Sequence, residues 1–180
     1  MILRHKNKFY KSLKKAVKDI ILKHGMKDGP CHLEMKYSGK KWKLIEANPR
    51  VSGGAMNAFI EAAYGISLVG ETLKFALGLK PNFNCKYKKE TFLQYVIAPQ
   101  KGILEKVTGA NRALNSEGVK AVYIKPKKES IIMPPISMAY RYAYVIAAGE
   151  TAEEARQNAK YAASQIEFHL YEDFERVRIN

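Results

Sequence analysis

Glu34, Glu46 and Asn48 are residues whose types and spacing could do chemistry. Twelve positions separate the two glutamates, and Asn48 follows Glu46 by two. Opposed carboxylates repel one another, so such a pair favours a cation between them. Mg²⁺ takes oxygen ligands, typically carboxylates together with nucleotide phosphate oxygens and water. Two glutamates and an asparagine carbonyl supply that ligand set, provided that the fold brings them to one face.

A hairpin would bring them together. Residues 31–37 and 41–47 read as two strands with a tight turn at Ser38-Gly39-Lys40. A three-residue loop at 39–41 places Glu34 directly opposite Glu46, and Asn48 shares their face if the strand continues. Trp42 falls on the same face, beside the turn, where it is expected to pack.

Hairpin geometry alone favours a second interpretation, in which the two glutamates bind no metal. The hairpin could be exposed, with its two acids neutralised by the nearby lysines Lys36, Lys41 and Lys43. His32 shares the face of Glu34 and could approach a phosphate or a substrate. A histidine at a strand end can equally be satisfied by local hydrogen bonds.

The string Leu44-Ile45-Glu46-Ala47-Asn48-Pro49-Arg50, followed by Gly53-Gly54, resembles the signature of the ATP-grasp family. The resemblance implies that Glu34, Glu46 and Asn48 ligate Mg²⁺ (or Mn²⁺) ions that bridge the phosphates of ATP. It also implies that Arg50 faces the transferring phosphoryl group and an acyl-phosphate intermediate. Gly53 and Gly54 precede an expected helix, where backbone N–H groups can face an anion. Ordinary turn chemistry is the alternative for these glycines.

The elements around this motif suggest two α+β modules. Helices are expected at 9–24, 55–64 and 68–77, and a boundary falls at 80–84. Strands are expected at 92–98, 103–107, 119–124 and 142–148, with a short helix at 111–116 and a loop at 125–135. A capping box at Thr151-Ala152-Glu153-Glu154 predicts a helix running to about Leu170. The expected domains are 1–80 and 90–180.

The segment after residue 90 resembles the C-terminal domain of ATP-grasp carboxylate-amine ligases of the amino-acid ligase type. Lys101-Gly102-Ile103 and residues 142–155 carry this resemblance. The fold class is therefore α+β: the C-terminal part of an ATP-grasp domain, an antiparallel sheet with helices, followed by a small α+β accessory domain. A biotin carboxylase relationship ranks lower, because that family's Glu-Cys-Arg-Ile string is missing from this sequence.

The sequence begins only one helix before the hairpin, whereas ATP-grasp enzymes carry a nucleotide lid and an adenine hinge upstream. We therefore expect an excised domain, a truncated product or one piece of a split enzyme, inactive alone. The expected ligands are ATP and a small carboxylate. A homodimer or an upstream-encoded lid fragment is a further partner to consider. The alternative from another class is a non-catalytic basic binding module.

Composition sets outer bounds. The 180 residues are 47% hydrophobic, which supports a packed core, and 31 basic against 17 acidic residues give a net charge of +14. That excess favours an anionic partner without choosing one. The sequence has neither an RNP-like pattern nor a helix-turn-helix, which disfavours nucleic acid. No apolar run has membrane-spanning length and no signal peptide is visible, so the cytoplasm is expected.

Overall fold

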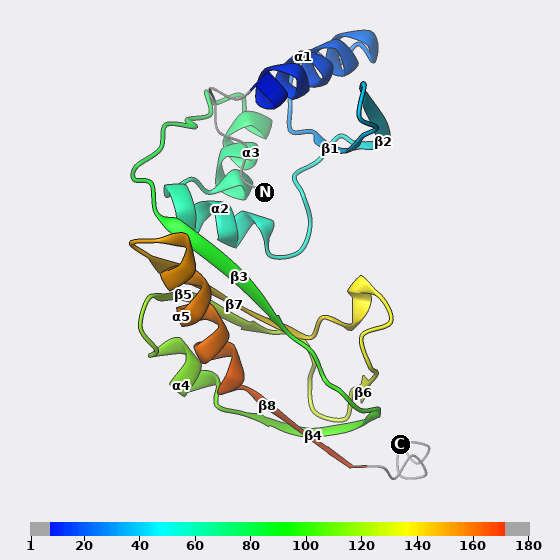
Figure 1. The fold of residues 1–180 in the computed structure, drawn as a ribbon. Helices are drawn as coiled ribbons and strands as arrows, with labels where there is room; N and C mark the ends of the chain where they lie inside the picture. Colours follow the sequence, from blue (N-terminus) through cyan, green and yellow to red (C-terminus); the bar gives the residue numbers. More distant parts are fainter. Residues whose placement is uncertain (1–7, 172–180) are drawn as a thin grey trace. The chain divides into compact units, whose positions relative to one another are not determined.

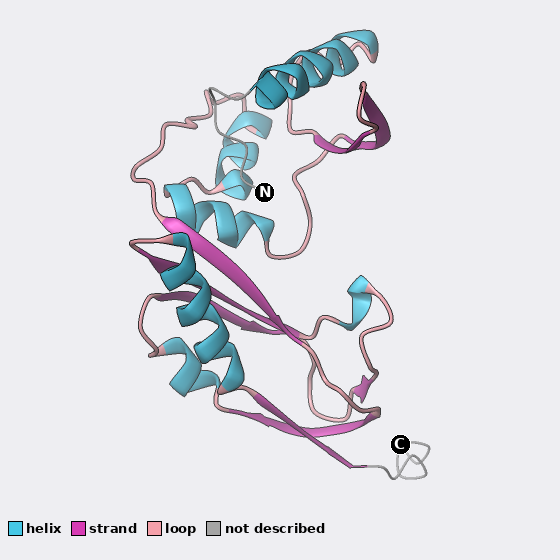
Figure 2. Cartoon of the chain, in the orientation of Figure 1, coloured by secondary structure: helices cyan, strands magenta, loops and turns pink. Residues whose placement is uncertain are grey.

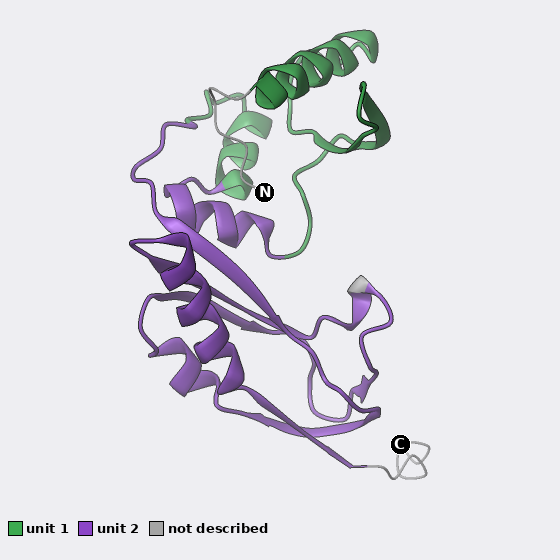
Figure 3. Ribbon diagram, in the orientation of Figure 1, with its two compact units in different colours: residues 1–54, 68–82 green, residues 55–67, 83–180 purple. Residues whose placement is uncertain are grey.

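Residues 8–171 are described by a computed structural model, in which helices accompany antiparallel strands (Figure 1, Figure 2). The fold is α+β, as predicted. The chain divides into two compact units, shown in Figure 3. Unit 1 comprises residues 1–54 and 68–82, and unit 2 comprises residues 55–67 and 83–180. The predicted division into domains 1–80 and 90–180 stays a prediction.

Unit 1 is built around an amphipathic helix and a hairpin. Phe9 of the helix packs on the hairpin aromatics, with ring centroids 4.6 Å from Tyr37 and 4.7 Å from Trp42. The indole Nε1 of Trp42 also donates to Ser12 Oγ at 3.1 Å. Trp42 is therefore a packing residue, as expected. The elements of this unit are α1 (Lys8–Lys23), β1 (His32–Tyr37), β2 (Trp42–Asn48) and α3 (Leu68–Ala76).

Unit 2 contains two three-stranded antiparallel sheets with the orders β3-β7-β5 and β6-β4-β8. Helix α5 packs against β7 and β3, and α4 against β5 and α5 (Figure 1). Helix α2 contacts β3, β5 and β7. The elements are α2 (Met56–Tyr64), β3 (Glu90–Val96), β4 (Gly102–Thr108), α4 (Ala110–Leu114), β5 (Val119–Ile124), β6 (Ile131–Ile132), η1 (Met138–Tyr140), β7 (Ala143–Gly149), α5 (Ala152–Ser164) and β8 (Glu167–Tyr171).

The hydrophobic core of the described chain lies entirely in unit 2. Val145 of β7 packs with Ala162 and Ala163 of α5, which are small enough to let the helix approach the sheet closely. Val107 and Phe168 pack against this cluster and against a second one, so the two sheets share their core. In the described part of unit 1 no hydrophobic residue is fully buried. Burial of apolar surface therefore stabilises unit 2 far more than unit 1.

The C-terminal helix is shorter than predicted. The capping box is present, since Thr151 Oγ1 accepts the Glu154 amide at 3.1 Å and the Glu154 carboxylate accepts the Glu150 amide at 2.9 Å. However, α5 ends at Ser164 and residues 167–171 form β8, paired with β4. The prediction of helix to Leu170 was wrong because long-range pairing outweighed helical continuation. The expected loop at 125–135 likewise contains the two-residue strand β6.

Candidate functional site

The predicted pairing of the two glutamates is confirmed. In the β1–β2 ladder Glu34 lies opposite Glu46, and His32 lies opposite Asn48. Since side chains alternate along a strand, His32 and Glu34 share one face with Glu46 and Asn48. Both glutamates are exposed, whereas His32 and Asn48 are half-buried. The hairpin thus presents two carboxylates, an amide and an imidazole on one surface.

The route to this register differs from the prediction. Ser38 N donates to Lys41 O at 3.0 Å, so the loop is the two-residue Gly39-Lys40 and not 39–41. Gly39 supplies the positive φ of 82° that such a tight turn favours. The register then shifts by one residue, because Met35 pairs with Leu44 and Glu34 with Glu46, leaving Ile45 as an extra residue. The bulge at Ile45 restores the predicted opposition of the glutamates.

The same bulge corrects the placement of Trp42. Trp42 pairs with Tyr37 and Leu44 with Met35, on the face opposite Glu34. The expectation that Trp42 shares the face of Glu46 was wrong, because it counted strict alternation through Ile45. The hairpin consequently separates an aromatic face that packs on α1 from a polar face that carries the glutamates.

Among the described residues, the nearby lysines make no ion pair with either glutamate. Lys36 and Lys43 lie opposite each other, one step along the same face. The polar face therefore carries facing acids beside facing bases, and each carboxylate keeps its oxygens free for a cation.

His32 adds a second signal to this face. Its Nδ1 atom is buried and has no hydrogen-bond partner among the described residues. A buried polar atom without a partner is costly and uncommon, and a bound water or ion is one of the explanations for such an atom. Local hydrogen bonds therefore do not satisfy this nitrogen, contrary to the simpler expectation for a strand-end histidine.

The donor set fits Mg²⁺ only with outside help. Glu34, Glu46 and Asn48 offer oxygen ligands of the type that Mg²⁺ prefers. The described residues hold no group of three or more His, Cys, Asp or Glu side chains placed to bind a metal ion unaided. The remaining coordination positions would have to come from water or a phosphate-bearing ligand. Their assignment as metal ligands is a prediction.

Arg50 follows the hairpin in an irregular loop. Its amide donates to Asn48 O at 2.8 Å, and its guanidinium Nη1 donates to Val51 O at 2.9 Å. The side chain is exposed, so most of its five donors stay open to an anion. A Cβ added at Gly53 would lie 4.0 Å from Arg50 Nη1, which places the guanidinium beside that backbone. The loop therefore places the positive charge of Arg50 beside a glycine backbone that no side chain covers.

Gly54 adopts φ 67°, a conformation that side-chain-bearing residues rarely take. Two residues later α2 begins, and its N-cap residue Ala55 makes no side-chain capping hydrogen bond. The predicted role of Gly53 and Gly54 in facing an anion stays a prediction.

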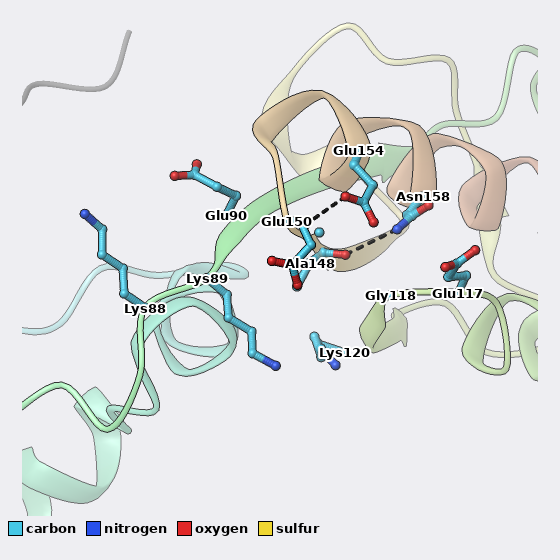
Figure 4. A pocket seen from close by; sticks show the side chains of 11 residues that line it. Lys88, Lys89, Glu90, Glu117, Gly118, Lys120, Ala148, Glu150, Glu154 and Asn158 are labelled. Carbon is cyan, nitrogen blue, oxygen red and sulfur yellow. Dashed lines mark hydrogen bonds between the residues drawn. The ribbon is translucent and has the colours of Figure 1, made fainter.

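A polar pocket of about 560 Å³ lies in unit 2 beside the start of α5. Figure 4 shows Lys89 and Lys120 on one side of it and Glu150 and Glu154 on the other. Glu154 is already committed to the helix cap. Sequence reasoning did not single out this pocket, and none of the predicted site residues lines it.

Part of the sequence is similar to a known family and to two curated proteins. Residues 94–171 match the family described as L-amino acid ligase C-terminal domain 2. An uncharacterised protein, y4rH, from Sinorhizobium fredii is 25% identical over 146 residues, covering 81% of this chain and 30% of its own. Human carnosine synthase 1 is 37% identical over 57 residues, covering 32% of this chain and 7% of its own.

Solved structures share the fold at low sequence identity. L-amino acid ligase from Bacillus licheniformis matches with a TM-score of 0.74 and 16% identity, covering 94% of this chain and 43% of that one. Phosphoribosylglycinamide synthetase from Anaerococcus prevotii matches with a TM-score of 0.80 and 18% identity, covering 95% and 44%. A biotin carboxylase domain from Hydrogenobacter thermophilus matches with a TM-score of 0.64 and 18% identity, covering 94% and 37%.

The chain spans less than half the length of the proteins that it matches in these comparisons. The similar structures are ATP-grasp ligases, and the fold matches their C-terminal part. Among residues 8–171, no helix combines the length and the apolar character that crossing a membrane requires.

Proposed function

Because the chain has the fold of the C-terminal part of ATP-grasp ligases, we propose that it is part of an ATP-dependent carboxylate-amine ligase. The register that sets Glu34 opposite Glu46 is the observation that carries the proposal. An L-amino acid ligase and a carnosine synthase among the similar proteins support this reaction class. The substrate would be a small carboxylate.

The proposed reaction has two steps, a phosphoryl transfer to the carboxylate and an acyl transfer to the amine. A carboxylate oxygen attacks the γ-phosphorus of ATP, the bond from that phosphorus to the bridging oxygen breaks, and an acyl phosphate and ADP form. An amine nitrogen then attacks the acyl carbon, the bond from carbon to the phosphate oxygen breaks, and phosphate leaves. The amine loses one proton as the amide forms. Phosphoryl transfer of this kind depends mainly on positioning and on stabilising charge.

Glu34, Glu46 and Asn48 would hold Mg²⁺ (or Mn²⁺) together with phosphate oxygens of ATP. When bound, the metal would neutralise phosphate charge and orient the nucleotide. The β1–β2 register places the backbone of Glu34 opposite that of Glu46 before any ligand arrives, so binding would need only the two exposed side chains to become ordered. His32, which lies opposite Asn48 on the same face of the hairpin, would lie beside the same ligand.

Arg50 would stabilise the transferring phosphoryl group. Its planar fork of N–H donors matches phosphate oxygens, and one donor is held by Val51 O, which orients the guanidinium. The neighbouring glycines Gly53 and Gly54 would leave room for an anion close to the backbone. Each of these roles acts on charge that develops during transfer, so it would affect turnover more than folding.

We further propose that activity needs the part of the ATP-grasp fold that this chain does not span. That part would be supplied by upstream sequence or by an upstream-encoded lid fragment. Positioning elements can contribute on the order of 7–11 kcal/mol of barrier reduction. A chain holding only the metal-ligand hairpin and Arg50 should therefore be nearly inert.

Phosphate release tests this proposal. We expect almost no ATP-dependent phosphate release from the 180-residue chain with a panel of amino acids. A version extended by the coding sequence immediately upstream should release phosphate and form amide product. In that version Glu46→Ala and Arg50→Ala should each lower turnover by about 100-fold or more. The matched control Arg112→Ala, which removes an exposed arginine from unit 2, should leave turnover unchanged.

Two outcomes would overturn parts of the proposal. Robust release by the short chain, abolished by Glu46→Ala, would show that it is sufficient alone. Absence of release from the extended chain with every carboxylate would favour the non-catalytic basic binding module instead.

A further inference from the structure

A second cavity in unit 2 combines apolar walls with one arginine. It measures about 560 Å³ and lies where β3 meets the loop before β7. Its walls include Leu93, Ile97, Pro135 and Ile136, with Arg141 beside them. The isoleucines Ile97 and Ile136 are 48% and 77% exposed, which is unusual for neighbouring large apolar side chains. Small-molecule sites typically occupy roughly 300–1,000 Å³ and are mostly apolar with a few polar anchors.

A ladder of tyrosines fixes the arginine at this cavity. Tyr123, Tyr144 and Tyr95 stand in register on β5, β7 and β3, so they share one face of the sheet. Tyr123 stacks on Tyr144 with ring centroids 5.2 Å apart, and Tyr144 meets Tyr95 edge-on at 6.3 Å. The Arg141 guanidinium then lies over the Tyr95 ring at 4.5 Å from its centroid. This cation–π contact holds the guanidinium over the ring, and its N–H donors make no hydrogen bond to a described residue.

The charge of the cavity is one-sided. Arg141 is exposed and forms no ion pair with any described residue. None of the residues that line the cavity is acidic. The site therefore offers a charged partner to a carboxylate and no acidic partner to an ammonium group, with Gln94 and Ser137 adding neutral polar groups.

We propose that this cavity binds a small organic carboxylate that carries an apolar side chain, with Arg141 pairing to the carboxylate and Ile97 and Ile136 covering the apolar group. The ammonium group of a free amino acid would meet no acidic partner here and would lie near the positive charge of Arg141, so an N-acylated amino acid should bind more tightly than the free one. The site lies wholly within unit 2 and contains neither Glu46 nor Arg50. It therefore shares no residue with the proposed ligase site.

Three related probes test the chemistry by calorimetry and by NMR titration of the whole chain. N-acetyl-leucine should bind more tightly than leucine, and the NMR shifts of both should map to residues 93–97 and 135–141. Leucinamide lacks the carboxylate and should bind at least about tenfold more weakly. Equal binding of leucinamide, or no binding of N-acetyl-leucine at millimolar concentrations, would overturn the proposal.

Variants test the residues. Arg141→Gln and Ile136→Ser should each weaken N-acetyl-leucine binding, the former by at least about tenfold. Arg112→Gln serves as the matched arginine control, and Glu46→Ala should leave this binding unchanged. Circular dichroism verifies that each variant keeps its fold. An unchanged affinity in Arg141→Gln would refute the assignment. Concentration-dependent dimerisation lost in Ile136→Ser would show instead that a second copy covers the cavity.

Discussion

Glu34 and Glu46 owe their relationship to register alone. Each carboxylate is exposed, and neither is held by an ion pair within the described chain. Strand pairing nevertheless keeps them opposite each other, at a separation where like charges repel. A cation bound between the two carboxylates would relieve this repulsion. Solvent weakens the repulsion but does not remove it.

The polar face of the hairpin should bind a divalent cation weakly. Mg²⁺ or Mn²⁺ alone should bind only weakly, in the millimolar range or above, because Glu34, Glu46 and Asn48 leave several coordination positions to water. Titration calorimetry should show this binding weakening further in Glu46→Gln. Glu117→Gln, which removes an exposed carboxylate from unit 2, is the control. Tight binding that survives Glu46→Gln would contradict the assignment.

Tyr144 gives a prediction about pH. Its burial, followed by the neighbouring Tyr123 and Tyr95, raises the pKa of the Tyr144 phenol above its ordinary value of 10.0. The unfolded chain then releases this proton at a lower pH than the folded chain does. The stabilising contribution is therefore complete below about pH 10 and is lost as the pH rises through the folded-state pKa.

Unfolding measured from neutral to strongly alkaline pH checks this. Above pH 10, the free energy of unfolding of the natural chain should fall more steeply than that of Tyr144→Phe, which has no phenol to titrate at this position. Tyr161→Phe removes a phenol that is 64% exposed and should behave like the natural chain. Parallel curves for the natural chain and Tyr144→Phe would contradict the prediction.

At the scale of elements, the distance to a neighbouring backbone decides at which glycines a side chain would be costly. Gly109 and Gly78 have similar backbone angles, φ 81° and 75°. A Cβ at Gly109 would overlap the carbonyl oxygen of Gln165, just after α5, whereas a Cβ at Gly78 would meet open space. Gly109 therefore sets how closely the turn before α4 approaches the end of α5.

Alanine at these two positions separates strain from overlap. Gly78→Ala should cost about 1–2 kcal/mol through its left-handed conformation alone. Gly109→Ala should cost at least about 1–3 kcal/mol more, because the backbone of Gln165 must move. Denaturant unfolding measures both costs, followed by Trp42 fluorescence for Gly78→Ala in unit 1 and by circular dichroism for Gly109→Ala in unit 2. Equal costs would show that Gln165 shifts freely and that the approach is not tight.

At the scale of the whole molecule, the two units differ in what holds them together. Unit 2 contains the fully buried hydrophobic residues, whereas the described part of unit 1 has none. Large apolar side chains of unit 1 such as Leu22, Leu73 and Leu77 are between 60% and 76% exposed. Unit 1 should therefore unfold more easily than unit 2.

Two probes can follow the units separately. Trp42, the single tryptophan, reports on unit 1, and we expect its fluorescence to change at a lower denaturant concentration than the main circular dichroism transition. Ile146→Ala, in the core of unit 2, should destabilise unit 2 by about 2–5 kcal/mol. The variant should leave the midpoint of the Trp42 fluorescence transition unchanged. Coincident transitions that shift together would show instead that the chain unfolds as one cooperative body.

The sequence by itself determined the local features. The cap at Thr151 and the strands around Glu34 and Glu46 depend on residues only a few positions apart, so turn and cap preferences suffice to predict them. The glutamate pairing was predicted from an incorrect loop length, and the bulge at Ile45 compensated for that error. Alternation in a strand predicts a face only when no residue is inserted.

Only the tertiary structure decided the features that join distant segments. Residues 167–171 read locally as helix, yet they pair with β4, some sixty positions earlier, where they complete a shared core. The cavity at Arg141 likewise needs β3 and the 135–141 loop together, and its arginine is fixed by the ring of Tyr95. Such contacts depend on which surfaces gain most by burial, and that balance is set by the whole fold.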